Sequence, residues 1–516
     1  MKKYLIPCFL QTILLLSLFA SAQDNPLFRH LPPDAERVYH INLPVFLSKI
    51  DLSNPMLGML SQASAGEWKS ILQDPTLTGV DLKKDFFITQ QGSSLANAPT
   101  YTTILIHLTD SGKFISLVEK QSKGFHRVHL SGKQAVASSG NTGYAWNDQL
   151  VVITTIKSPK DSSAMIQSAP LSYSTLAIQK SLASLKGYDN STFTTNTFFK
   201  TGMSDDADFH LWGPQGALLQ SLVEVMKNKV PNGQAVLQAM NKIHTKTLMT
   251  LRFDVGKITF TAKTPLSQDT VAVYAPVLSR QFNPDLLARI PGGSLLALMS
   301  VNFNFSAMEG YLEKFKVKEK VDSMLGKTGL KFSDILHSFK GDFLFAAVAP
   351  EETGGTSSGP AGMPNFYFVT TIGDQAAFTN LSSQTHLIDT AGGESMLSKL
   401  KASCTLRDGI LVVGRSKTQT DAFFTASSRR STDLVTPQMR KYPYNLAIDF
   451  KTVAAFIRSM NSQSSKLQQA LHVLDGLDKF TLSMGALENN VMETTLEFKM
   501  ADASSNSLVA IFNLLH

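Results

Sequence analysis

Cysteine is almost absent from this chain of 516 residues, which contains only Cys8 and Cys404. Cys8 falls within an N-terminal hydrophobic stretch that we expect to be removed, so Cys404 is alone in the rest of the chain. The mature protein therefore cannot form an internal disulfide, and side-chain packing must stabilise its fold. No Cys/His signature surrounds Cys404, so the thiol is not predicted to be catalytic or to bind a metal.

Long hydrophobic runs are also missing, apart from the first one. Met1-Lys2-Lys3 precedes the apolar stretch Tyr4 to Phe19 and the small residues Ala20-Ser21-Ala22, which is the layout of a secretory signal peptide. We expect cleavage after Ala22 and export to the periplasm or the extracellular space. Later apolar runs are shorter than the roughly 18 to 20 residues that cross a bilayer, so the mature protein is expected to be soluble. Pro7 argues against lipid attachment at Cys8.

Charge of either sign is sparse and scattered. The formal net charge is +7, yet the longest basic runs are pairs such as Lys83-Lys84 and Arg429-Arg430. Nucleic-acid binding needs basic clusters interleaved with aromatics, so this class of partner is excluded. A hydrophobic content of 43% with 17% charged residues predicts a globular protein. The partner expected from this composition is an unknown envelope protein or polymer, and oligomeric state is not predicted.

Catalytic and cofactor motifs are absent as well. The chain has no His-Glu-x-x-His helix, and its Gly-x-Ser-x-Gly match, Gly355 to Gly359, falls within a Gly- and Ser-rich loop and not at the strand-to-helix turn of a nucleophile elbow. Gly326-Lys327-Thr328 resembles the end of a phosphate-binding loop, but Val321 stands where the first glycine should be. The sequence therefore predicts no catalytic residue, no cofactor-binding residue, no metal ligand and no enzyme activity.

What the sequence does contain is an internal duplication. Leu31 to Ala35 followed by Val38 to Asn42 has a counterpart about 260 residues later, in Ile290 to Ser294 followed by Leu298 to Asn302. Each copy predicts a proline-started apolar strand that leads into an amphipathic helix. Further pairs follow in the same order, namely Lys84–Phe87 with Gly341–Leu344, Ile104–His107 with Phe366–Val369, Leu150–Val152 with Ile410–Val412, Phe209–Trp212 with Asn445–Ile448, Thr247–Phe253 with Phe480–Met484, Ile258–Ala262 with Val491–Leu496, and Val271–Tyr274 with Leu508–Ile511.

This order predicts two tandem, structurally similar α+β units of mixed, mostly antiparallel sheets with packed helices. The signal peptide covers residues 1–22, the first unit residues 23–283 and the second unit residues 284–516. Their boundary is expected near Gln281 to Asp285, after the closing helix of the first unit.

The opening Leu31 to Ala35 with Ile41-Asn42-Leu43, and the Gly79-Val80-Asp81-Leu82 that precedes a strand, resemble an exported Bacteroidetes family. That family is grouped as domain of unknown function four-eight-three-six. The resemblance implies a Gram-negative cell-envelope setting and no established activity. Members are often lipoproteins, and this chain departs from them in lacking a credible lipid-attachment cysteine.

Residues present in only one copy are the best places to look for chemistry, and Asp205 to His210 is the most suggestive stretch. A strand over residues 206–212 would place Asp206, Asp208 and His210 on one face. Carboxylates and imidazole together can bind a metal ion, but the same alternation is typical of a half-exposed strand, and the second reading is favoured.

The repeated aspartates have structural explanations. Asp110 and Asp374 are predicted to cap helices, whereas Asp148 and Asp408 are predicted to occupy turns. Two Gly- and Ser-rich loops, 92–99 and 353–364, occupy the same place in both copies. They are either simple connections or loops that close over a partner.

Three functional hypotheses follow. The first, which we favour, is a non-catalytic binding or structural module of the cell envelope. The second is a periplasmic solute- or lipid-binding protein, which a large apolar cavity would support. The third is a hydrolase with a dispersed active site, which a cleft with buried titratable groups would support.

Overall fold

Two compact units make up the chain, Met1–Arg252 and Phe253–His516. The computed structural model describes residues 25–49, 75–92, 99–122, 124–129, 135–158, 173–214, 246–291, 293–314, 318–325, 330–350, 363–387, 401–425, 439–460 and 465–514, with 397, 435 and 437. The predicted signal peptide, nearly all of both Gly- and Ser-rich loops, Gly326-Lys327-Thr328 and Arg429-Arg430 lie outside these residues.

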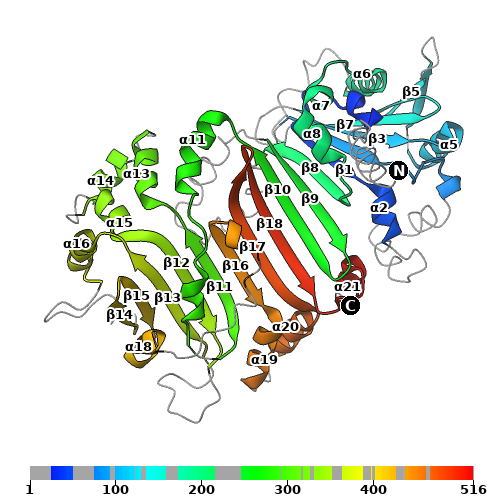
Figure 1. Cartoon of the computed structure of the whole chain (residues 1–516). Coiled ribbons are helices and arrows are strands. Elements are labelled where there is room, and N and C mark those ends of the chain that lie inside the picture. The colour runs from blue at the N-terminus through cyan, green and yellow to red at the C-terminus, as the bar shows by residue number, and fades with distance from the viewer. Residues whose placement is uncertain are drawn as a thin grey trace, which may run out of the picture. The chain divides into compact units, whose positions relative to one another are not determined.

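The first unit is built on an antiparallel sheet in which the strands pair in the order β9-β8-β1-β2-β3-β7-β6-β5-β4 (Figure 1). Buried and half-buried residues alternate along β1, β2 and most of β8, as a two-faced sheet requires. Their bounds are β1 Arg37–Ile41, β2 Phe86–Gln91, β3 Thr100–His107, β4 His126–His129, β5 Ala135–Ser139, β6 Thr142–Trp146, β7 Leu150–Lys157, β8 Phe209–Pro214 and β9 Lys246–Asp254.

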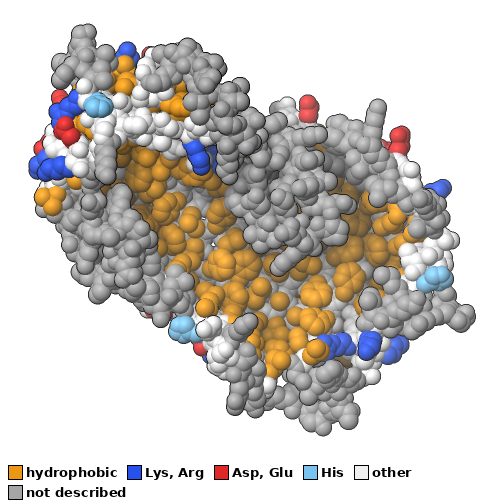
Figure 2. Space-filling model, turned by 180° about the vertical axis from the view of Figure 1, so that it is seen from behind, with side chains coloured by type: hydrophobic (Ala, Val, Ile, Leu, Met, Phe, Trp, Pro, Cys, Tyr) orange, Lys and Arg blue, Asp and Glu red, His pale blue; other side chains and the backbone are white. Residues whose placement is uncertain are grey.

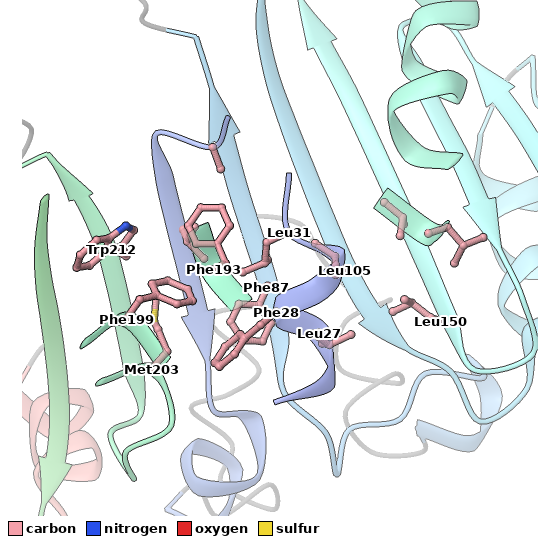
Figure 3. Close-up of a cluster of buried hydrophobic side chains, with 14 of the residues drawn as sticks. Leu27, Phe28, Leu31, Phe87, Leu105, Leu150, Phe193, Phe199, Met203 and Trp212 are labelled. Carbon is pink, nitrogen blue, oxygen red and sulfur yellow. The ribbon is translucent and has the colours of Figure 1, made fainter. Parts of the chain in front are cut away.

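One face of this sheet carries the main core of the unit. Phe28 packs edge-on against both Phe87 and Phe199, which join the start of the chain to β2 and to a later helix (Figure 3). Close approach of a helix to β6 requires Gly143, because a Cβ there would lie 2.3 Å from the backbone of Ala177. The helices of the unit are η1 Pro26–His30, α2 Leu43–Ser48, η2 Pro75–Leu77, α5 Ser111–Gln121, α6 Tyr173–Lys186, α7 Thr192–Thr195 and α8 Thr197–Met203.

The second unit repeats this plan. Its antiparallel strands pair in the order β10-β18-β17-β16-β11-β12-β13-β15-β14. Their bounds are β10 Lys257–Pro265, β11 Leu295–Asn302, β12 Phe339–Val348, β13 Asn365–Ile372, β14 Ser403–Arg407, β15 Ile410–Gly414, β16 Tyr444–Asp449, β17 Leu477–Glu488 and β18 Val491–Met500.

Helices and strands are interspersed along the second unit as they are in the first. The largest cluster of buried side chains in this unit includes Leu298, Leu344 and Val412. The helices are α11 Gln268–Val277, α12 Pro284–Ala288, α13 Phe305–Lys314, α14 Lys318–Leu325, α15 Phe332–Ser338, α16 Gln375–Thr385, α18 Lys417–Thr425, η5 Met439–Lys441, α19 Phe450–Ser459, α20 Ser465–Asp475 and α21 Ser507–Leu514.

The predicted duplication is confirmed by strand pairing. The run β9-β8-β1-β2-β3-β7-β6 has the same chain order and directions as β17-β16-β11-β12-β13-β15-β14. One predicted alignment needs a shift of one residue. His210 lies opposite His40 and Asn445 lies opposite Ser300, so the counterpart of His210 is Asn445, and that of Phe209 is Tyr444.

The compact units divide at Arg252 and Phe253, some thirty residues before the predicted boundary at 283 and 284. The reason is β10, which the order of the repeat places in the first unit. This strand pairs with β18 over nine residue pairs, from Lys257 opposite Lys499 to Pro265 opposite Val491.

The second unit carries hydrophobic side chains in rows across one face of its sheet, as the view from behind shows (Figure 2). These side chains are half-buried or exposed, with Met299 37% and Phe368 36% exposed. One row joins seven strands in register, and it consists of Phe260, Leu496, Leu482, Leu446, Met299, Phe345 and Phe368. The corresponding row in the first unit is Met249, Leu211, Tyr39, Ile88, Ile104, Ile153 and Tyr144.

Among the described residues, no helix combines the length and the apolar composition that crossing a membrane demands.

Candidate functional site

Two buried histidines form the centre of the site in the first unit. His40 and His210 lie opposite each other on β1 and β8, and each side chain is at most 2% exposed. Their Nδ1 atoms are 2.9 Å apart, and the rings stack with centroids separated by 4.7 Å. On its other side the His40 ring stacks on Phe87 at 4.5 Å. The two imidazoles therefore form a tight pair inside the core face of the sheet.

Each histidine also faces a carboxylate through Nε2. The Nε2 of His210 is 2.5 Å from Asp205 Oδ1, and the Nε2 of His40 is 3.2 Å from Asp85 Oδ2, without the alignment of a full hydrogen bond. Asp85 also accepts a hydrogen bond of 3.0 Å from Asn25 Nδ2. All four ring nitrogens thus face a partner.

The environment shifts the pKa values of this cluster. Burial lowers the pKa of His40 below its usual 6.5. The neighbouring Asp85 carboxylate favours the protonated ring and would raise this pKa, but it opposes the effect of burial only in part. Burial would raise the pKa of Asp205, but hydrogen bonds from His210 and from the Ala207 N–H, with the charge of Arg252, lower it to about 2. Near neutral pH the His40 ring is therefore uncharged, whereas the Asp205 carboxylate is ionised.

The hypothesis of a metal site on Asp206, Asp208 and His210 is wrong in its geometry. The strand begins at Phe209 rather than at residue 206, and Asp206 is 82% exposed and paired with Arg252. Asp208 is fully buried and lies 2.7 Å from Lys49 Nζ. Each carboxylate is thus held by a cation, and the described residues contain no cluster of three groups that could hold a metal ion. The polar side of this strand faces the interior, which reverses the predicted half-exposed arrangement.

A polar cavity of about 590 Å³ adjoins the histidine pair. It lies where β1 and β3 end and β2 begins, and its lining includes His40, Asn42, Asp85 and His107 together with Lys83 and Lys84. Burial lowers the pKa of His107, and the positive charge of Lys84 acts in the same direction. Desolvation and a nearby ammonium group both disfavour imidazolium there.

A second cavity of about 590 Å³ lies in the same unit and is mainly apolar. Ile88, Ile104 and Ile153, which are half-buried, and the buried Tyr144 supply one wall from β2, β3, β7 and β6. The helix α5 supplies the other wall through Phe114, Leu117 and Val118. The loop from Thr78 to Asp85 forms one end. This loop is held close to α5 because Gly79 O accepts hydrogen bonds from the N–H groups of Thr109 and Asp110.

The second unit has no equivalent histidine pair. Ser300 and Asn445 occupy the positions of His40 and His210, and Asn445 donates to Ser300 at 3.4 Å while accepting from Ser483 at 2.8 Å. The counterpart of Asp85 is Asp342, which accepts from Thr371 Oγ1 and pairs with Arg280. The titratable cluster is therefore specific to the first unit.

The other predicted residues have structural roles. Asp110 and Asp374 cap α5 and α16 by accepting backbone N–H groups, as predicted. Asp408 occupies the turn between β14 and β15 with φ of 52°. At the matching turn of the first unit the capping side chain is Asn147, whose Oδ1 accepts from Gln149 and Leu150. Cys404 lies half-buried on β14.

Sequence reasoning found Asp205 and His210 but missed His40, Asp85, Lys49 and Arg252. Those four come from segments far away along the chain, and only the fold brings them together. One usable indication existed, since His40 stands where the second copy has Ser300.

Comparisons with known proteins give little further information. No protein-family model matches the chain, and no curated protein matches it. Among solved structures, three crystal forms of TP0453, forms I, III and IV, are similar, each with a TM-score of 0.28. Form I is 9% identical in sequence, and the similarity covers 48% of this chain and 80% of that one. Form III is 8% identical, with 51% and 90% covered. Form IV is 8% identical, with 50% and 86% covered. Such low TM-scores support no statement about what this chain binds.

Proposed function

We propose that this protein is a non-catalytic binding protein for a ligand with an acyl chain, which it holds in the apolar cavity of the first unit. The observation that carries this proposal is the cavity itself, about 590 Å³ in volume and walled by the sheet and α5. This volume lies within the range of about 300 to 1,000 Å³ that is usual for small-molecule sites.

The walls suit a flexible apolar chain. Ile88, Ile104 and Ile153 lie side by side on three neighbouring strands, and they face the helix residues Leu117 and Val118 across the cavity. Burying about 300 Å² of acyl surface at about 25 cal/mol per Å² is worth about 7.5 kcal/mol before the entropic cost of binding. Subtracting an association cost of about 4 kcal/mol leaves about 3.5 kcal/mol, so we expect affinities in the millimolar range from the chain alone.

The histidine pair favours a binding role over a hydrolytic one. A general base needs a free ring nitrogen within hydrogen-bond reach of its substrate. The Nδ1 atoms of His40 and His210 face each other, and both Nε2 atoms face carboxylates. Thr250 lies opposite His210 on β9, but the described contacts include no hydrogen bond from a serine, threonine or cysteine to either ring. These arguments support the absence of catalysis in our proposal.

The setting that we propose is the cell envelope. It is supported by the order of residues in Met1 to Ala22 and by the family resemblance in Leu31 to Ala35. Neither observation bears on the nature of the ligand. The proposal of an acyl-chain ligand rests on the apolar cavity alone.

Equilibrium binding of radiolabelled palmitate and hexadecanol to the purified protein tests the proposal. Ile104→Trp fills the cavity from the sheet, and Val118→Trp fills it from α5; each should weaken binding of both ligands by about tenfold or more. Leu211→Trp is the matched control, because Leu211 is half-buried on the same face but does not line the cavity. Absence of binding by the parent protein, or equal loss in the control, would contradict the proposal.

A further inference from the structure

The polar and the apolar cavity of the first unit meet at one place. Lys84 and Asp85 line both of them, at the point where the loop that follows Thr78 enters β2. Along β2, Phe86 and Ile88 face the apolar cavity, while Asp85 and Phe87 point to the core face with the histidine pair. The two cavities therefore lie on opposite faces of the sheet and open together around its end.

The two carboxylates near this junction differ in how far their charge is compensated. Asp205 is bound by His210 and Arg252, and Asp85 is bound by Asn25 and lies beside His40. Arg252 therefore offsets the charge of Asp205, whereas Asp85 meets only the neutral Asn25 and His40, so Lys83 and Lys84 must outweigh its repulsion of a bound anion.

The cations are not compensated in the same way. Lys83 and Lys84 are exposed, and within the part of the chain that the structure describes neither ammonium group has an ion-pair partner. The nearest carboxylate in sequence, Asp81, uses Oδ1 to accept the backbone N–H of Lys83, which fixes the turn that presents the lysines. The junction therefore has two adjacent ammonium groups available to a ligand.

Neutral hydrogen-bonding groups complete the junction. His107 lies at the end of β3 and lines the polar cavity with Asn42, whose Oδ1 caps α2 by accepting from Val45 at 3.3 Å. The side-chain Nδ2 of Asn42 remains oriented by that bond. An anionic oxygen at the junction would thus meet two ammonium donors and the neutral polar groups of Asn42 and His107.

We propose that the ligand is a single-chain amphiphile with an anionic head group, whose head binds Lys83 and Lys84 at the junction while its acyl chain fills the apolar cavity. This inference rests on the proposed function, and it adds the class of head group and the orientation of the ligand. A carboxylate and a phosphate share the required chemistry, so both are tested as sources.

The test compares ligands that share a chain and differ in the head. Palmitate and palmitoyl lysophosphatidate are expected to bind the parent protein about tenfold or more tightly than hexadecanol, since charge-assisted hydrogen bonds form only with the first two. In Lys83→Ala/Lys84→Ala this preference should disappear through weaker binding of both anions, with hexadecanol unchanged. Tighter binding of palmitate than of the lysophosphatidate identifies a carboxylate as the head group of the ligand, and the reverse order identifies a phosphate.

A matched control separates local contacts from net charge. Lys120→Ala/Lys157→Ala removes the same charge from two exposed lysines that line neither cavity, and it should keep the preference for anions. Inorganic phosphate alone should bind at least a hundredfold more weakly than the lysophosphatidate, because it buries no chain.

Equal affinity of the parent protein for all three amphiphiles, or an unchanged preference in Lys83→Ala/Lys84→Ala, would overturn this inference. Neither result would affect the proposed function, which fails if hexadecanol and palmitate both fail to bind, or if Leu211→Trp weakens binding as much as the cavity variants do. Strong binding of inorganic phosphate alone would also overturn the inference and would instead assign the junction to free phosphate.

Discussion

His40 and His210 face each other through Nδ1 atoms 2.9 Å apart, with both side chains buried. Two neutral rings carry two N–H groups. One can serve the bond to Asp205 and one the bond between the rings, which leaves a lone pair on His40 Nε2 facing Asp85. A third proton would sit on His40 Nε2 and make that ring an imidazolium paired with Asp85. The protonation state of His40 therefore decides how the cluster is bonded.

Because burial lowers the pKa of His40, we expect the protein to lose stability in mild acid. Below pH 6.5 the unfolded chain takes up a proton that the folded His40 does not, so the free energy of unfolding decreases as pH falls. The loss stops once pH passes below the folded pKa. Each such histidine contributes at most about 1.4 kcal/mol per pH unit, and His30 and His107 act in the same direction. Urea unfolding between pH 8 and pH 4.5 measures this.

The second unit supplies the control for that prediction. His40→Ser/His210→Asn copies the neutral pair Ser300 and Asn445 into the first unit. The double variant should unfold with a smaller pH dependence, and the remaining slope should come from His30 and His107, with Glu309 adding to it at the acid end because its pKa is also lowered. A slope equal to that of the parent protein would show that His40 is not a source of the acid sensitivity.

Lys49 and Asp208 form a second test of buried charge. Asp208 is fully buried, and its Oδ2 lies 2.7 Å from Lys49 Nζ. Lys49→Met should lower the free energy of unfolding by about 3 kcal/mol, because it leaves a buried carboxylate without its cation. Lys49→Met/Asp208→Asn should recover part of that loss. If Lys49→Met changes the unfolding free energy by less than about 1 kcal/mol, the pair behaves like an exposed salt bridge.

The duplicated fold could be predicted because its marks are local. Short sequence patterns are enough to indicate an apolar strand such as Leu298–Asn302 or a turn such as Asp408-Gly409. Such patterns remain recognisable in both copies although the sequence identity between them is low. The boundary could not be predicted in the same way. The pairing of β10 with β18 joins Thr261 to Thr495, and no local pattern indicates a partner at that distance.

The candidate site was predictable only in part, for a related reason. Asp205 and His210 lie in one polar run, whereas His40, Asp85 and Lys49 each look ordinary in their own segment. The alternation after Asp205 predicts a half-exposed strand, because a polar face usually points to solvent, but here Asp208 and His210 are buried. A cavity cannot be predicted from the periodicity of hydrophobic residues. The sequence around Ile88 and Ile104 would show the same alternation if a helix packed directly on these side chains.

The loop that closes one end of the apolar cavity depends on Gly79. This residue has φ of 70°, and a Cβ there would lie 2.0 Å from Asp110 O. Gly409 has the same φ of 70°, with nothing within 4 Å of a Cβ. Gly409→Ala should cost about 1 kcal/mol from backbone strain alone, and Gly79→Ala should cost about 2 kcal/mol more. Denaturant unfolding of both variants compares them, and equal losses would show that the loop moves freely away from α5. Gly79→Ala should also weaken palmitate binding, because Val80 and Leu82 line the cavity.

The assignment of β10 to the second unit can be tested by truncation. A chain of residues 253–516 keeps the nine pairs between β10 and β18, whereas a chain of residues 284–516 leaves β18 as an open edge. That edge carries Leu496 and Phe498, both half-buried even with β10 in place, and exposed apolar edges promote aggregation. We expect the longer chain to be monomeric by size-exclusion chromatography and the shorter one to aggregate. Ala262→Pro in the longer chain breaks the pairing near its centre and should reproduce the behaviour of the shorter chain, because Ala262 and Thr494 form a hydrogen-bonded pair of the ladder and proline cannot donate to it. If residues 284–516 are as monomeric and as stable to urea as residues 253–516, β10 contributes nothing to the second unit, and the boundary lies near residue 283, where the repeat places it.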